Sequence, residues 1–322
     1  MNALRAQGIG FCFAAVGATY GAAAYRQLPP ATSLGLVGIL IIALGVPHGA
    51  LDTLIAHQRG WVPTWSRWLK FITWYLASAA LVMALWAVAP ALFLAGFLVA
   101  SLVHFSGDPL EGTPIATRIL HGGAAIVLPT LLHPDEVERS LSILSDGPSA
   151  HACVVLLHLV SLPWTLASIL AIGAALRRDG FAGLELLALG ALMIFAPPLL
   201  AFTVFFCGMH GARHIVRALR YYDLKISLGQ IAAVVLPTLA VFLLLTTVWQ
   251  FLRGVPFESK ATAVIFVALA ALTFPHMAVV EPLRRVGWRA SDNGSPTRRD
   301  RSAARAAGNS RNVTSEVQLR PV

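Results

Sequence analysis

Long apolar stretches separated by short polar segments make up most of the chain from residue 8 to residue 282. A helix needs roughly 20 apolar residues to cross the hydrocarbon core of a bilayer. Stretches of that length or somewhat shorter cover residues 8–24, 32–51, 69–89, 91–105, 118–132, 152–176, 183–196, 197–214, 227–251 and 261–282. The pattern predicts an all-α, polytopic transmembrane helix bundle of about ten spans. Nine spans is the alternative, because Pro197 and Pro198 can break one long segment instead of separating two.

The composition narrows the class of protein further. Hydrophobic residues make up 57% of the 322 residues and charged residues 12%, where soluble domains have about 45–50% and about 25%. This excludes a soluble globular enzyme, a disordered chain and a disulfide-stapled secreted module. Cys12, Cys153 and Cys207 are too widely separated to predict a disulfide framework or a CxxC metal site.

The formal net charge of +9 is concentrated near the C-terminus, where residues 284–322 hold nine arginines against three acidic residues. Basic segments next to membrane spans usually face the cytoplasm. We therefore expect both termini on the cytoplasmic side of the cell (inner or plasma) membrane, and no nucleic-acid partner. The expected domains are a transmembrane unit, residues 1–283, and a basic disordered cytoplasmic tail, residues 284–322.

Ten histidines are present, and ionisable groups at membrane depth are costly and usually functional. In the ten-span topology, the cytoplasmic ends of four spans carry His48, His104, His210, His214 and His276. His210 and His214 are four residues apart and share one helical face, so the pair can bind one transition metal. A single intramembrane histidine is often only a hydrogen bonder between helices. Four at matching depth, two with an aspartate one turn on and two forming an HxxxH pair, favour a shared metal site instead.

Two aspartates repeat the four-residue offset. Asp52 follows His48 and Asp108 follows His104 at this spacing. Each carboxylate could accept the second ring N–H of its own histidine or of a neighbour's, which would fix the direction of the ring. His276 has three possible roles: a fifth ligand, a hydrogen-bond donor behind the ligands, or part of a substrate cavity.

The other histidines fit a metal site less well. We expect His57 and His121 near the interface on the same side as the site, and His133, His151 and His158 on the opposite side. Cys207 is one turn from His210, but a small buried thiol usually packs, so we leave it out of the ligand set.

Three aromatic residues and one arginine lie next to the histidine pair. Phe202, Phe205 and Phe206 could line an apolar substrate channel, although helix packing explains them equally well. Arg213 could anchor the helix at the cytoplasmic interface or pair with one of the two aspartates, and the positive-inside bias favours the anchor.

In these motifs the chain resembles the Brp/Blh family of bacterial and archaeal membrane β-carotene 15,15′-dioxygenases. The resemblance covers about residues 32–283 and rests on Pro47-His48-Gly49-Ala50-Leu51-Asp52, His104-Phe105 with Asp108, Phe206-Cys207-Gly208-Met209-His210 with Arg213-His214, and Pro275-His276.

The resemblance implies cleavage of the central double bond of β-carotene by dioxygen, giving two molecules of retinal at a non-haem Fe(II). The iron ligands implied are His48, His104, His210 and His214. The implied partners are β-carotene or a related carotenoid, O₂ and membrane lipid, with a retinal-binding protein as a downstream recipient.

Other classes of protein also use intramembrane histidines. A membrane di-iron hydroxylase or desaturase needs roughly eight histidines to fill two metal spheres, and only one HxxxH pair is present. A transporter or proton-coupled carrier would relay protons through His and Asp pairs, but here these groups gather on one side of the membrane. A bis-His haem protein is a third alternative.

Overall fold

A computed structural model describes residues 3–222, 239, 246, 249–250 and 254–285. These residues form helices and loops, with no strand among them. Most of the ninth expected span, residues 227–251, and the tail from residue 286 lie outside the described residues.

The helices are α1 (Ala3–Tyr20), α2 (Ala22–Arg26), α3 (Pro30–Leu40), α4 (Val46–Gln58), α5 (Trp65–Val88), α6 (Pro90–Phe105), α7 (Ile115–Val127), α8 (Pro134–Ser142), α9 (Gly147–Arg178), α10 (Gly180–Phe195), α11 (Pro198–Val204), α12 (Ala212–Tyr222) and α14 (Phe257–Arg285). Three irregular turns interrupt them: the π-helical turns η1 (Ile41–Gly45) and η3 (Phe205–Gly211), and the 3₁₀ turn η2 (Leu128–Leu131).

Five continuous helices are long and apolar enough to cross a membrane: Pro30–Gln58, Trp65–Val88, Gly147–Arg178, Pro198–Tyr222 and Phe257–Leu283. A sixth candidate combines α7 and η2 with α8, but the chain bends by 109° between them. Helices α6 and α10 are apolar but only 16 residues long. The prediction of an all-helical bundle with membrane-spanning helices is thus confirmed. Five or six candidate spans, not ten, are found in the described part of the chain.

Local sequence signals explain where several helices begin. Pro90 and Pro198 stand at the first position of α6 and α11, where a missing N–H costs nothing. Ala196 and Pro197 separate α10 from α11. The side chains of Asp146 and Asp179 accept hydrogen bonds from the first backbone N–H groups of α9 and α10, as aspartate does at helix N-termini.

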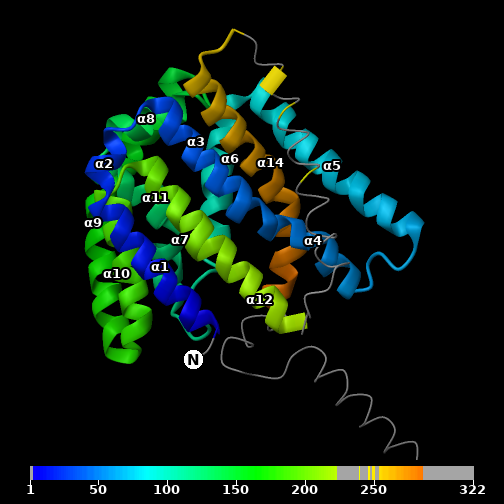
Figure 1. The fold of residues 1–322 in the computed structure, drawn as a ribbon, viewed down its shortest axis with the longest axis horizontal. Helices are drawn as coiled ribbons and strands as arrows, with labels where there is room; N and C mark the ends of the chain where they lie inside the picture. The colour runs from blue at the N-terminus through cyan, green and yellow to red at the C-terminus, as the bar shows by residue number, and fades with distance from the viewer. Residues whose placement is uncertain (1–2, 223–238, 240–245, 247–248, 251–253, 286–322) are drawn as a thin grey trace, which may run out of the picture.

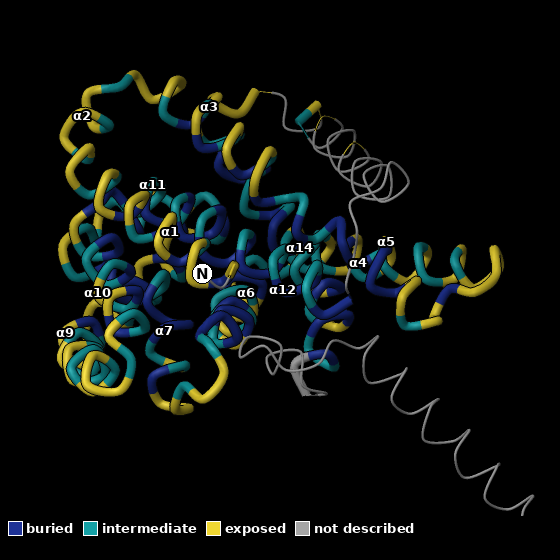
Figure 2. Tube along the Cα trace, turned by 60° about the horizontal axis from the view of Figure 1, so that its bottom comes forward, coloured by how far each residue is buried: buried dark blue, intermediate teal, exposed yellow. Residues whose placement is uncertain are grey.

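The bundle has inner and outer helices (Figure 1). In their most apolar windows, 56% of the residues of α14 and of the Pro198–Tyr222 segment are buried, against 6% for α5 and 11% for α9. Figure 2 shows the exposed residues of α5 and α9 on the two sides of the molecule. Many of these exposed residues are apolar, such as Leu159 and Leu170 on α9. Surfaces of this kind suit lipid rather than water.

Helix α7 approaches the C-terminal end of α6 at a glycine. A Cβ atom on Gly122 would lie 2.4 Å from the carbonyl oxygen of Leu102 and 2.6 Å from the backbone nitrogen of Ser106. No side chain fits there unless the two helices move apart. His104 lies between these two contact points in α6, so the glycine also fixes the place of a candidate site residue.

We predict that Gly122→Ala lowers the free energy of unfolding by about 1–3 kcal/mol, because the added methyl group meets backbone atoms that cannot turn away. The matched control is Gly173→Ala in α9, where a Cβ atom meets nothing within 4 Å. Alanine favours helix there, so the control should be as stable as the unchanged protein or more stable. Thermal unfolding of both variants in detergent tests this, and equal melting temperatures for the two would contradict it.

Candidate metal centre

Five histidine side chains converge in the middle of the bundle. They come from α4, the end of α6, η3, α12 and α14, and each residue is at most 6% exposed. Neighbouring ring centroids lie 4.6 to 5.5 Å apart. The five residues are His48, His104, His210, His214 and His276. The structure therefore brings together all four predicted ligands and His276.

Two π-helical turns lie next to these histidines. His210 is inside η3, and η1 ends three residues before His48. A π turn adds one residue, which rotates the side chains that follow by about 100° relative to an unbroken α-helix, and such turns are frequent at functional sites. The two turns pack against each other where Gly211 leaves room, because a Cβ atom there would lie 3.3 Å from Nδ1 of His48.

Asp108, in the loop between α6 and α7, orients His210. Nδ1 of His210 lies 3.0 Å from each oxygen of the buried carboxylate. An ionised carboxylate only accepts hydrogen bonds, so Nδ1 donates and the lone pair of the ring is on Nε2. This Nε2 atom is buried and has no hydrogen-bond partner among the described residues. Asp108 thus supports a histidine of another helix.

Asp52 orients His276 in the same way. Nδ1 of His276 lies 2.8 Å and 3.0 Å from the two carboxylate oxygens, and the hydroxyl of Tyr75 donates to one of them at 2.9 Å. Nδ1 of His48 donates to the carbonyl oxygen of Gly45. The sequence left open whether each carboxylate pairs with its own histidine or with a neighbour's. Both aspartates pair with a histidine of another segment.

Arginine side chains hold the loop that carries Asp108. Arg217 donates to the carbonyl oxygens of Gly107 and Asp108, each at 3.0 Å. Arg118 donates to the carbonyl oxygen of Ser106 at 3.0 Å. These contacts satisfy carbonyl groups of the residues that directly follow α6.

The interpretation of Arg213 as an interfacial anchor is wrong. The residue is 1% exposed and forms a buried ion pair with Glu185 of α10. Its Nε donates to the side-chain oxygen of Gln7 at 2.8 Å, and Nη1 lies 3.4 Å from the carbonyl oxygen of Asp108. A buried guanidinium needs such a partner because an unpaired charge in the interior is very costly.

Sequence reasoning missed Glu185, Arg217 and Tyr75. Glu185 is the one acidic residue in the apolar stretch 183–196, and a charge at membrane depth is a signal that could have found it. Arg217 stands one helical turn after Arg213, as a charged neighbour on the same face. Tyr75 lies in an aromatic-rich helix and gave no such signal.

The three candidate phenylalanines have different surroundings. The ring of Phe206 stacks on His210 with centroids 5.7 Å apart, and the ring of Phe202 stacks on Phe206 at 5.4 Å. Phe205 turns instead toward Phe105, with centroids 5.0 Å apart. Phe206 is thus the one in contact with the histidine cluster.

An apolar cavity of about 100 Å³ lies next to Phe202 and Phe105. Its walls include Phe105, Phe202 and Phe266, and the ring of Phe105 lies 4.9 Å from the ring of His210. The cavity is therefore one aromatic ring away from the histidine cluster.

The remaining histidines lie apart from the cluster. His57 is exposed on α4, and His121 is buried beside Phe205, with ring centroids 5.9 Å apart. His133, His151 and His158 contact residues outside the centre. The thiol of Cys207 donates to a backbone carbonyl at 3.4 Å, which agrees with leaving it out of the ligand set.

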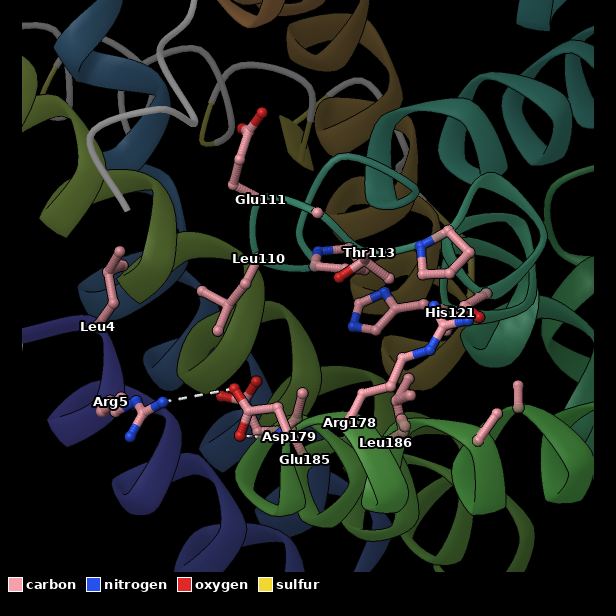
Figure 3. Close-up of a pocket in the computed structure, with 18 of the residues that line it drawn as sticks. Leu4, Arg5, Leu110, Glu111, Thr113, His121, Arg178, Asp179, Glu185 and Leu186 are labelled. Atoms are coloured by element: carbon pink, nitrogen blue, oxygen red, sulfur yellow. Dashed lines mark hydrogen bonds and ion pairs between the residues drawn. The ribbon is translucent and has the colours of Figure 1, made fainter. Parts of the chain in front are cut away.

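A larger cavity, of about 790 Å³, opens between α1, α7, α9, α10 and the loop after α6 (Figure 3). Figure 3 shows charged side chains around it, among them Glu111, Arg178 and the ion pair of Arg5 with Asp179. Charged walls suit water or polar groups better than a hydrocarbon, so this cavity is not assigned to an apolar substrate.

The donor chemistry of the cluster fits a first-row transition metal, since neutral imidazole nitrogens are typical ligands of these ions. The buried Nε2 atoms of His210 and His276 fit this as well, because a metal ion would satisfy both. Among the described residues, no three His, Cys, Asp or Glu side chains stand in the arrangement of a formed metal site.

Comparison with known proteins places these residues in a family. The family model described as beta-carotene 15,15′-dioxygenase matches residues 39–284, a range that includes all five histidines. A beta-carotene 15,15′-dioxygenase from uncultured marine bacterium 66A03 is 29% identical over 252 residues, which cover 75% of this chain and 90% of the relative. A probable beta-carotene 15,15′-dioxygenase Blh from Halobacterium salinarum is 26% identical over 284 residues, covering 76% and 82%.

No solved structure matches the chain. The family match covers more than half of the chain and agrees in extent with the motifs around the histidines. The chain belongs to the family of beta-carotene 15,15′-dioxygenases.

Proposed function

We propose that this chain cleaves the central 15,15′ double bond of β-carotene with dioxygen. One C=C bond is replaced by two C=O bonds, and one oxygen atom of O₂ enters each of the two retinal molecules. β-Carotene supplies all the electrons, so the reaction needs no separate reductant. The convergence of five buried histidines, inside the range that matches the family, supports this proposal most directly.

The residues proposed to hold a non-haem Fe(II) are His48, His104, His210 and His214. When bound, the iron supplies the activation of dioxygen. The chain positions the imidazoles: Asp108 accepts the Nδ1 proton of His210, and the carbonyl oxygen of Gly45 accepts that of His48. Both rings then present Nε2 lone pairs, and ring orientation of this kind raises metal affinity.

The surroundings of the cluster suit a hydrocarbon substrate. Phe206 and Phe105 contact the histidine rings, and Phe105 and Phe202 line the neighbouring apolar cavity. These rings would exclude water from a polyene bound there. The shape of this aromatic wall is proposed to select the central bond among many similar double bonds. A related carotenoid would be selected by the same features.

The location of the substrate agrees with a membrane site, since β-carotene dissolves in lipid and the outer helices expose apolar surfaces. We place the chain in the cell membrane with nine or ten spans and both termini in the cytoplasm. Residues 284–322 are proposed to be a basic cytoplasmic tail. A retinal-binding protein is the proposed recipient of the product.

Expression in a bacterial host that accumulates β-carotene tests the activity. The unchanged chain should deplete β-carotene and produce retinal, measured by chromatography of the extracted pigments. His210→Ala should give no detectable retinal and no retained iron, whereas His57→Ala, which changes an exposed histidine, should behave like the unchanged chain. Retinal from the His210→Ala variant would remove this residue from the ligand set. Unchanged β-carotene with folded, iron-loaded protein would overturn the proposed substrate.

A second prediction concerns the carboxylate behind His210. Asp108→Asn keeps the shape of the side chain but removes its charge, and losing such a partner of a metal ligand costs about 10–100-fold in metal affinity. Competition with a chelator on purified protein measures this. The matched control is Asp146→Asn at the exposed start of α9, where asparagine caps a helix as well as aspartate. Unchanged iron affinity in Asp108→Asn would show that the pairing with His210 does not support the metal.

A further inference from the structure

His276 occupies a central place in the histidine cluster. Its ring centroid lies 5.2 Å from that of His48, 5.2 Å from that of His104 and 4.9 Å from that of His214. It therefore contacts three of the four proposed ligands. His48 also contacts three rings of the cluster. It is also the one member of the cluster that α14 contributes.

The hydrogen bonds of His276 engage one ring nitrogen and leave the other without a partner among the described residues. Nδ1 donates to the carboxylate of Asp52, so the lone pair of the ring is on Nε2. Nε2 is buried and has no hydrogen-bond partner among the described residues. A buried polar atom without a partner is costly, and a metal ion in the cluster would remove that cost.

The same arrangement surrounds His210, which belongs to the proposed ligand set. Each of the two rings donates Nδ1 to a buried aspartate from another segment and leaves Nε2 unsatisfied. A residue that acted only from behind the ligands, as Asp108 does, would use its atoms to hold a neighbour. His276 instead receives such support, because Asp52 holds it and Tyr75 holds Asp52.

We propose that His276 is a fifth histidine donor to the metal, with Asp52 and Tyr75 as the positioning residues that aim its Nε2 atom. This inference rests on the proposed function, because it assumes a metal bound by the other four histidines. It also gives a role in the site to the outer helix α5, which carries Tyr75 and packs against α14.

The proposal can be tested on the purified full-length chain, stripped of metal and titrated with Co²⁺, whose visible absorption depends on the number and type of its ligands. His276→Gln removes the imidazole but keeps an N–H donor for Asp52, which preserves the buried contact. We expect this variant to bind Co²⁺ at least about 10-fold more weakly and to change the absorption spectrum. Tyr75→Phe should weaken binding about 10-fold and leave the form of the spectrum unchanged.

Two controls separate the possible failures. His57→Gln changes an exposed histidine on α4 and should match the unchanged chain in affinity and spectrum. His210→Gln should lose most Co²⁺ binding. If His210→Gln binds Co²⁺ like the unchanged chain, the proposed centre fails as a whole. If His210→Gln loses Co²⁺ while His276→Gln keeps both affinity and spectrum, only the fifth donor is overturned.

A second variant guards against a loss of binding that comes from misfolding. In His276→Ala, added imidazole should occupy the space of the missing ring and restore the lost absorption bands. Melting temperatures measured without metal show whether each variant is folded. A folded His276→Ala variant whose spectrum equals that of the unchanged chain before any imidazole is added, or does not respond to imidazole, would contradict the role of His276 as a ligand.

Discussion

The hydrogen bonds between buried aspartates and histidines determine how the centre of this bundle is arranged. Asp108 with His210 and Asp52 with His276 each join two segments that are far apart in the sequence. In an interior with few polar groups, an unpaired carboxylate would be very costly. Each pair therefore favours one way of packing its segments together, and the same contact decides which ring nitrogen keeps its lone pair.

Irregular backbone makes these contacts possible. A regular α-helix through the η3 segment would place the side chains after it, including that of His214, about 100° away from their present direction. The η1 turn has the corresponding position before His48. The close packing at Gly211 depends on the absence of a side chain, because the ring of His48 occupies the space beside it. The cluster thus depends on backbone geometry as much as on the choice of histidine.

The sequence predicted those features that depend on length, depth and spacing. The length of the apolar stretches predicted α5 and α9, and the depth of the histidines predicted their convergence. The π turns were not predictable, because one added residue changes the hydrophobic periodicity too little to detect. The pairing of Arg213 was predicted wrongly, since the positive-inside rule describes the ends of spans and carries no information that Glu185 lies across from it in α10. The contact of Tyr75 with Asp52 was not predictable, because it depends on how α5 packs in the bundle.

The arginines at the end of α6 show how residues outside the cluster contribute to it. The C-terminal end of a helix carries partial negative charge, and here Arg118 and Arg217 bind the carbonyl groups of the residues that directly follow α6. Arg217 also donates to the carbonyl oxygen of Asp108 itself, so it holds the residue whose carboxylate lies against His210. An ionised carboxylate can only accept a hydrogen bond, which obliges His210 to donate through Nδ1 and to present Nε2. The direction of that nitrogen therefore depends on guanidinium groups that do not belong to the cluster.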